Sequence, residues 1–145
     1  MAIEIPSNEL FKVQVALEVR WSDLDALGHV NNARYFGYFE QGRIGYLERV
    51  APGRKLVESG VAPLLAHTEC DFLAPIEHPA SLLVGTRALR VGSSSVELQQ
   101  TVRGREGGRV HAIGRAVLVF FDLAAGAAVA IPQPLREAVR LLDGV

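Results

Sequence analysis

The segment from Asn32 to about Val50 constrains the fold more than any other part of this sequence. Its apolar spacing predicts one long helix. Apolar side chains occur on most sides of this helix: Tyr35, Phe36, Tyr38, Phe39, Ile44, Tyr46, Leu47 and Val50. A helix of this kind is surrounded by protein rather than laid on a surface. We therefore expect other elements to wrap around it.

Three glycines indicate what wraps the helix. Gly37, Gly42 and Gly45 each cost about 1 kcal/mol of helix propensity relative to alanine. A close approach between the helix backbone and a flat partner would explain why three glycines occur in the helix despite this cost. A curved sheet is the simplest such partner. The alternative is a core helix that merely tolerates glycine. Tyr35, Phe39, Gly42 and Tyr46 lie on one face, which is the face expected to meet the sheet.

One strand precedes the helix and four follow it. The expected strands are Phe11 to Trp21, Leu64 to Phe72, Ser81 to Val91, Ser95 to Arg103 and Arg109 to Asp122. Glycine-rich hairpin connections separate the last three strands. Residues 56–62 are expected to be loosely structured, and 124–130 to form a turn and linker. A short C-terminal helix is predicted from Pro134. The order is that of an α+β fold.

Composition excludes several classes of protein. A chain of 145 residues is the size of one domain, and no boundary divides residues 1–145. The net charge of −1 offers no basic field for nucleic acid or an anionic membrane. Cys70 is the only cysteine, so no intrachain disulfide can form, which suits a reducing compartment. Neither a signal peptide nor an apolar run of about 20 residues is present, so we expect a cytoplasmic protein without a membrane partner.

The loop before the helix carries the chemistry. Residues 21–32 contain the carboxylates Asp23 and Asp25, a turn at Gly28 and two N-cap residues, Asn31 and Asn32. A strand thus delivers carboxylates into a loop that leads to the positive end of a helix. A base or nucleophile beside an anion site is what acyl transfer requires. The alternative for Asp25 is an ordinary turn carboxylate bonded to its own backbone.

Other reactive side chains offer less. His67, His78 and His111 are scattered without metal-ligand spacing, so no metal site is expected. Cys70, inside a strand, is expected in the core rather than as a nucleophile. Glu40, on the helix, is held as a reserve carboxylate. No cofactor is expected.

The order of elements and the loop together resemble a known family. The run from Asp23 to Asn32, followed by Tyr35 and Phe36, is similar to the signature of the 4-hydroxybenzoyl-CoA thioesterase-like branch of the hotdog fold. The resemblance extends from about Val13 to Leu142. It implies a five-stranded curved antiparallel sheet wrapped around one long helix. It also implies hydrolysis of acyl-CoA, with coenzyme A as part of the substrate, in a homo-oligomer: a dimer, or a tetramer of two dimers.

The resemblance also assigns roles within the loop. Asp25 falls at the position of the catalytic carboxylate, either as base or as nucleophile. The backbone N–H of Asn32 falls at the position of the oxyanion donor, which suits the free N–H groups of a first helical turn. His29 and Asn31 belong to the same site, His29 as a structural or substrate-lining residue and Asn31 as a cap that could orient a water. Asp23 is expected to hold the loop.

Substrate contacts follow from the same comparison. The His-Val-Asn-Asn run favours aliphatic acyl-CoA over aroyl-CoA. Tyr35 is expected to contact the substrate. The expected contacts to the coenzyme A phosphates are Arg87, Arg90, Ser93 and Ser94, with Arg103 beside them. Arginine suits phosphate through its planar fork, although arginines on strands can equally form a solvated face.

Two other classes share this fold. A hydratase or dehydratase would use a histidine and an aspartate for proton transfer, and the loop holds both, but its motif usually lies on the helix. A non-catalytic acyl-binding protein is the third possibility, because a fold does not determine a function. Release of free thiol from acyl-CoA distinguishes the thioesterase from both.

Overall fold

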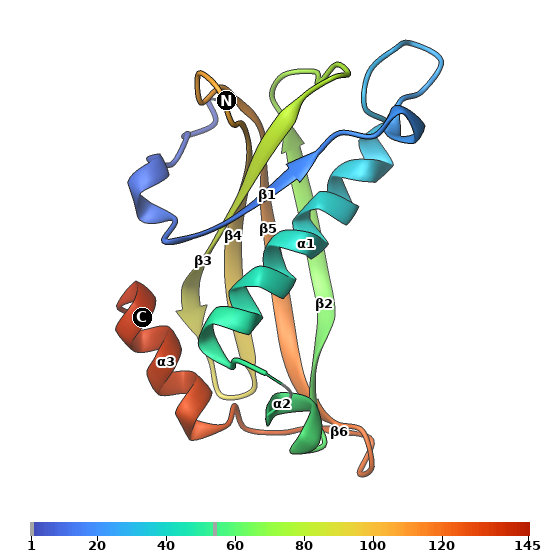
Figure 1. Cartoon of the computed structure of the whole chain (residues 1–145). Coiled ribbons are helices and arrows are strands. Elements are labelled where there is room, and N and C mark those ends of the chain that lie inside the picture. Colours follow the sequence, from blue (N-terminus) through green and yellow to red (C-terminus); the bar gives the residue numbers. More distant parts are fainter. Residues whose placement is uncertain (1, 54) are drawn as a thin grey trace.

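One long helix lies in the concave side of a curved antiparallel sheet. The computed structural model describes residues 2–53 and 55–145. The main elements are β1 (Val13–Glu18), α1 (Asn32–Val50), β2 (Val61–Phe72), β3 (Ser81–Val91), β4 (Ser95–Gly104) and β5 (Val110–Asp122). Shorter elements are α2 (Lys55–Glu58), β6 (Ala127–Ala128) and α3 (Gln133–Asp143). Figure 1 shows the strands running behind and beside α1.

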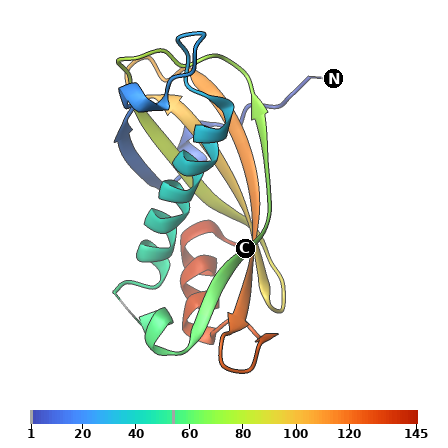
Figure 2. The ribbon, with the colours of Figure 1, turned by 90° about the vertical axis from the view of Figure 1, so that its right-hand side faces the viewer.

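The sheet has the strand order β1-β3-β4-β5-β2, and β6 pairs with the C-terminal end of β5. All these pairings are antiparallel. Seen from the side, the strands bend around α1, and α3 covers the far end of the fold (Figure 2). This is the hotdog arrangement of five strands and one long helix that the sequence predicted. The two-residue β6 is an addition to it.

The element boundaries differ from expectation at the ends. β1 is shorter than the predicted strand because the chain turns into a 3-10 helix at Trp21–Asp23, leaving Trp21 76% exposed. The stretch expected to be loose contains α2 and the first residues of β2. α3 begins one residue before Pro134, with Pro132 as its N-cap.

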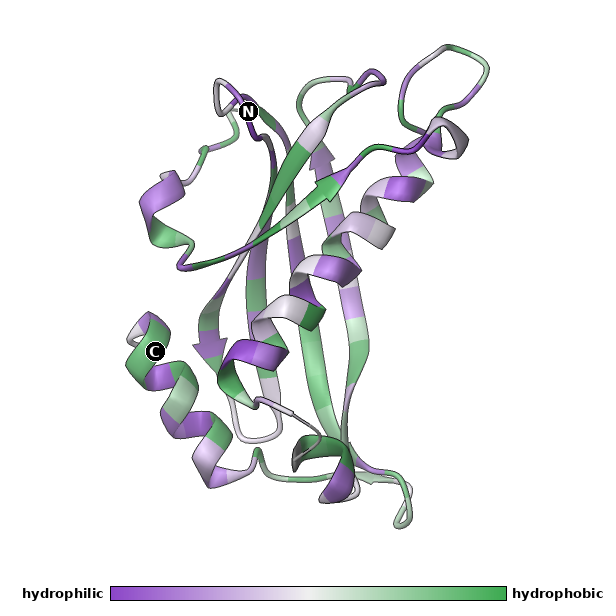
Figure 3. Cartoon of the chain, in the orientation of Figure 1, coloured by the Kyte–Doolittle hydropathy of each residue, from purple (hydrophilic) through white to green (hydrophobic). Residues whose placement is uncertain are grey.

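The predicted face of α1 is the buried one. Tyr35, Phe39 and Tyr46 are each 3% exposed or less, and their rings belong to the core between helix and sheet. The expectation that protein surrounds α1 is only partly right for the single chain, because Ile44 on the outer side is 53% exposed. Hydrophilic and hydrophobic residues alternate along α1 and α3 (Figure 3). Within the described residues, no helix is long and apolar enough to cross a membrane.

Two of the three helix glycines mark close contacts with the sheet. A Cβ on Gly42 would lie 2.6 Å from Val84 Cγ1, and one on Gly45 would lie 2.4 Å from Val15 Cγ2. Gly37 differs, because a Cβ there would meet nothing within 4 Å. The close-approach explanation therefore holds for Gly42 and Gly45 and is wrong for Gly37.

This difference gives a matched test of the packing. Gly42→Ala should lower the free energy of unfolding by about 1–3 kcal/mol, because Val84, Gln100 and Thr86 leave no room for a methyl group. Gly37→Ala should raise it by about 0.5–1 kcal/mol through helix propensity. Urea unfolding of both variants measures the two values. Equal effects of the two substitutions would contradict the packing of α1 on the sheet.

Candidate active site

The loop before α1 folds into a miniature hairpin. Leu24 pairs with Val30 in an antiparallel bridge, and two hydrogen bonds flank this pair. Asp25 N donates to His29 O at 2.9 Å, and Asn31 N donates to Asp23 O at 2.9 Å. Gly28, with a φ of 78°, adopts the left-handed conformation in the turn. The hairpin holds Asp25 close to the first turn of α1.

Asp23 ends the 3-10 helix Trp21–Asp23, and Asp25 follows the bridge residue Leu24, so the two carboxylates have different environments. Asp23 is fully buried. Its Oδ2 accepts from Tyr38 Oη at 2.7 Å and from Arg20 N at 3.0 Å. Burial raises the pKa of this carboxyl, but the hydrogen bonds from Arg20 and Tyr38 outweigh burial and leave the pKa below its ordinary value. Asp23 holds the loop, as expected.

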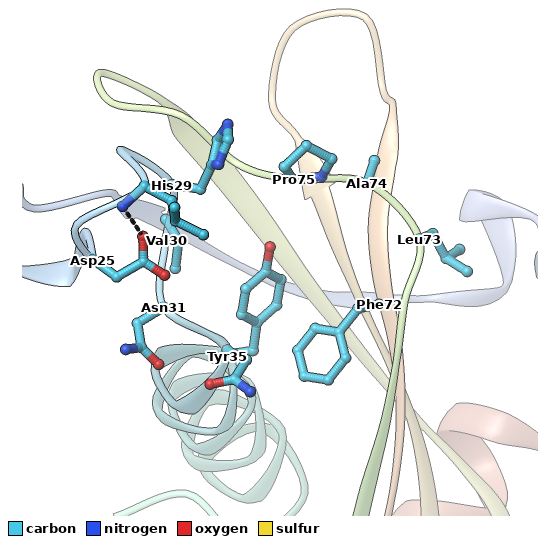
Figure 4. A pocket seen from close by; sticks show the side chains of 11 residues that line it. Asp25, His29, Val30, Asn31, Tyr35, Phe72, Leu73, Ala74 and Pro75 are labelled. Atoms are coloured by element: carbon cyan, nitrogen blue, oxygen red, sulfur yellow. Dashed lines mark hydrogen bonds between the residues drawn. The ribbon is translucent and has the colours of Figure 1, made fainter.

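Asp25 faces a pocket of about 500 Å³. Its walls are the hairpin, the start of α1 and the chain after β2: Asp25, Leu27, His29, Val30, Asn31, Asn32, Tyr35, Phe72, Leu73, Ala74 and Pro75. Figure 4 shows the carboxylate of Asp25 beside Asn31, with Phe72 and Pro75 across the pocket. Val30 N donates to Ile76 O at 2.8 Å, which joins the two walls.

One of the two oxygens of the Asp25 carboxylate is hydrogen-bonded within the protein. Its Oδ1 accepts from Leu27 N at 2.9 Å, so the turn interpretation is correct for this oxygen. Within the described residues, no donor is bonded to Oδ2. One oxygen thus orients the side chain, and the other is available to a ligand or a water in the pocket.

The start of α1 supplies a free donor beside this carboxylate. Asn31 is the N-cap, and its Oδ1 accepts from Ala33 N at 3.0 Å. The N–H of Asn32, the first helical residue, has no acceptor among the residues that the structure describes. A free first-turn N–H at the positive end of a helix can stabilise an anion. The structure therefore brings Asp25, Asn31 and Asn32 to one pocket.

His29 and Tyr35 complete the polar lining. His29 Nε2 lies 3.6 Å from Glu77 Oε1, a residue that the sequence did not indicate. Tyr35 is 3% exposed, and its ring packs edge-to-face on Phe72 with centroids 5.0 Å apart. Burial raises the pKa of the Tyr35 phenol, so it stays protonated. The hydroxyl of Tyr35 points away from the helix into the pocket (Figure 4).

The expected phosphate contacts do not join this pocket within one chain. Thr86 faces α1, so its neighbour Arg87 lies on the other face of the sheet, where it donates to Gln99 Oε1 and lies over the ring of Phe11. Arg103 donates to Pro6 O on that same outer face. Arg90, Ser93 and Ser94 lie at or beside the β3–β4 hairpin, whose Gly92 carbonyl accepts from Arg136 of α3. Their contact with phosphates stays a prediction that the single chain does not support.

The remaining candidates lie elsewhere. Burial raises the pKa of the Cys70 thiol to about 12, so it remains a protonated side chain packed against the core. Glu40 lines a different pocket, on the β1 side of α1. The part of the chain that the structure describes contains no group of histidine, cysteine or acidic residues able to hold a metal.

Sequence reasoning missed the opposite wall of the pocket and the partner of Asp23. Residues 72–75 carry no motif, and only the antiparallel return of the chain brings them beside the loop. Tyr38 is one of the apolar helix residues that the spacing identified, but the spacing gives it no partner in the loop. Its contact with Asp23 depends on the path of the loop, which no sequence pattern specifies.

The pocket thus combines a carboxylate, a free helical N–H and an apolar wall, which are groups that acyl transfer requires. The chain belongs to the thioesterase-like superfamily, whose family model matches residues 19–139. The protein is a thioester hydrolase, in agreement with its relatives.

Three similar proteins illustrate the range of the family. A thioesterase from Thermus thermophilus, solved with coenzyme A and zinc, is 37% identical and has a TM-score of 0.81, covering 94% of this chain and 98% of that one. The long-chain acyl-CoA thioesterase FadM of Escherichia coli is 26% identical, over 86% of this chain and 95% of its own length. The uncharacterized protein YsmA of Bacillus subtilis is 30% identical, over 83% of this chain and 80% of its own length.

Proposed function

We propose that the protein hydrolyses acyl-CoA to a free acid and coenzyme A, with Asp25 as base or nucleophile and the Asn32 N–H as oxyanion donor. The observation that carries this proposal is the shared pocket. Asp25, whose Oδ2 accepts no hydrogen bond from the described residues, and Asn32, whose N–H has no acceptor among them, both line it. A negative charge that develops on the thioester oxygen can meet the N–H without rearrangement of the protein.

Two chemical routes fit these groups. In the first, Asp25 accepts a proton from a water, whose oxygen attacks the thioester carbon. In the second, the Asp25 carboxylate attacks that carbon itself, and water then hydrolyses the resulting anhydride. In both routes the carbonyl oxygen becomes an oxyanion held by Asn32, and the C–S bond breaks to release a thiolate. Because thiols have a pKa of about 8–9, the thiolate leaves without a general acid, so one carboxylate and one N–H are enough.

The apolar part of the pocket suits the acyl group of a thioester. Val30, Phe72, Leu73 and Pro75 supply apolar surface near the reacting groups. FadM, a relative, acts on long-chain acyl-CoA. We infer an aliphatic acyl-CoA as the first substrate to test and an aroyl-CoA as the second. Coenzyme A is then part of the substrate, and the reaction needs no resident cofactor or metal.

The alternative class is a hydratase, which would need His29 and Asp25 to act together. The side chain of His29 lies beside Glu77, and His29 meets Asp25 only through the hydrogen bond from Asp25 N to its backbone carbonyl. A thiol-release assay over a series of acyl chain lengths, with coenzyme A and acyl-carrier-protein thioesters, decides the matter. Hydration of an enoyl-CoA without thiol release would contradict the proposal.

We also propose a homodimer formed through β2, and a tetramer of two such dimers. Among the residues that the structure describes, β2 pairs with β5 alone, which leaves its other edge free. Leu64, Leu65 and Phe72 on this strand are 43%, 46% and 49% exposed, and Phe36 on α1 is 36% exposed. A long apolar edge strand is a template for pairing with another chain.

The edge proposal predicts that Leu65→Asp weakens association while Leu123→Asp does not. Leu123 is 64% exposed but lies in the turn after β5 rather than on the free edge. Light scattering at micromolar concentration should show a dimer or tetramer for the parent and Leu123→Asp, and a smaller species for Leu65→Asp. A parent protein that is monomeric and fully active would contradict this assembly.

A further inference from the structure

We propose that the buried hydrogen bond between Tyr38 and Asp23 sets the position of Asp25 relative to the Asn32 N–H, which makes Asp23 and Tyr38 positioning residues. The inference rests on the proposed function, because it concerns the two groups assigned there to catalysis. Neither Asp23 nor Tyr38 lines the Asp25 pocket. Any effect of this pair on the reaction is therefore indirect and acts through the residues that Asp23 and Tyr38 contact.

On the loop side, Asp23 is joined to both strands of the miniature hairpin. Its backbone carbonyl accepts from Asn31 N, and Asp25 N two residues later donates to His29 O. A displacement of Asp23 therefore moves Asp25 and the N-cap Asn31 together. The carboxylate of Asp23 is the buried anchor of this unit, with an exposed fraction of 0%.

On the helix side, Tyr38 belongs to the same helix that supplies the oxyanion donor. Six residues separate it from Asn32, a rise of about 9 Å along a rigid helix. Tyr38 is 7% exposed, and its ring contacts that of Tyr35, a residue of the pocket, with centroids 6.1 Å apart. The hydrogen bond from Tyr38 to Asp23 thus connects the catalytic loop to the second turn of the helix.

Arg20 is the weaker of the two side-chain partners of Asp23. Its Nη2 lies 3.2 Å from Asp23 Oδ1, but the arginine side chain is 70% exposed. Exposed ion pairs contribute little because water screens them and the arginine loses conformational freedom. The Tyr38 hydroxyl is buried and bonded at 2.7 Å, so it provides the firmer restraint.

The same helix offers a matched control. Tyr46 is 1% exposed, and its hydroxyl donates to Asp143 Oδ2 at 2.5 Å. This tyrosine–carboxylate bond resembles the first in chemistry but connects α1 to α3 at the far end of the fold. Tyr38→Phe and Tyr46→Phe therefore remove the same group from α1, one beside the catalytic loop and one remote from it.

The test compares steady-state kinetics of these two variants at a temperature below both melting midpoints. Tyr38→Phe should lower kcat about tenfold with KM within about twofold of the parent, since small misplacements of reacting groups reduce the rate of the chemical step. Tyr46→Phe should leave both constants within about twofold of the parent. A double variant Asp23→Ala/Tyr38→Phe should have a kcat no lower than that of Asp23→Ala alone, because Asp23→Ala already removes the acceptor of the Tyr38 hydroxyl.

Hydrogen exchange gives a second readout that does not depend on activity. Tyr38→Phe should speed amide exchange at Asp25 and Asn31, the two donors of the hairpin, and Tyr46→Phe should not. Unchanged exchange at both amides, a Tyr38→Phe kcat equal to that of the parent, or an equal loss of kcat in Tyr46→Phe would each overturn the inference. An inactive parent with accelerated exchange in Tyr38→Phe would overturn the proposed function and leave the link between loop and helix established.

Discussion

Asp25→Asn should lower kcat for acyl-CoA hydrolysis by at least about 100-fold, in line with the contribution of a general base, while acyl-CoA still binds. The amide keeps the size of the side chain and can still accept the hydrogen bond from Leu27 N. It cannot take a proton from water or act as a carboxylate nucleophile. Because the turn geometry survives, the loss reports on chemistry rather than on the fold.

Asp122→Asn is the matched control for this substitution. Asp122 Oδ1 accepts from Ala124 N at 2.9 Å and Ala125 N at 3.0 Å, so it forms the same kind of turn at the end of β5. The control should keep the kcat of the parent. Asp23→Asn should cost much less than Asp25→Asn, because Asp23 does not line the pocket. An Asp25→Asn variant as active as the parent would exclude this carboxylate from the mechanism.

Asn32→Pro should raise the activation barrier by about 2.7–4 kcal/mol, roughly a 100- to 1,000-fold loss in kcat, because proline removes the N–H assigned to the oxyanion. The helix should tolerate the change, since proline is common at the first helical position. Asn31, the preceding residue, already has a φ of −60° and a ψ of 137°, which is the extended conformation that proline demands of its neighbour.

Asn32→Ala separates the backbone from the side chain. It keeps the N–H and should therefore retain much of kcat. Circular dichroism must first show that both variants keep the helix content of the parent. A folded, fully active Asn32→Pro enzyme would place the oxyanion donor elsewhere, and Ala33 N would be the next group to examine, although the Asn31 side chain already accepts from it.

Hydrophobic periodicity was enough to predict the main elements of the fold. The helix from Asn32 to Val50 and the strand from Ser81 to Val91 have the predicted limits, because capping residues, glycine turns and alternation act within a few residues of chain. The close approach at Gly42 and Gly45 was also predictable, since a glycine inside a helix needs a reason. Gly37 shows the limit of that argument, because only the position of the sheet decides which glycine it contacts.

The loop motif placed Asp25, Asn31 and Asn32 together for the same local reason: few residues separate them, and a turn at Gly28 joins them. The family resemblance gave Asp23 and Asp25 different roles, but no local pattern shows that one carboxylate is buried and that the other faces a pocket. Burial of Asp23 against Tyr38 and exposure of Asp25 to the pocket follow from how the loop packs on α1.

Long-range pairing decided the rest. The wall from Phe72 to Pro75 reaches the loop because β2 runs antiparallel to β5 and returns to the start of α1. Thr86 and Ala88 point from β3 toward the helix. Because side chains alternate between the two faces of a strand, Arg87 lies on the outer face. Local sequence therefore determined the elements and the chemistry of the loop. The face and neighbours of each side chain depended on strand register, which contacts between distant residues establish.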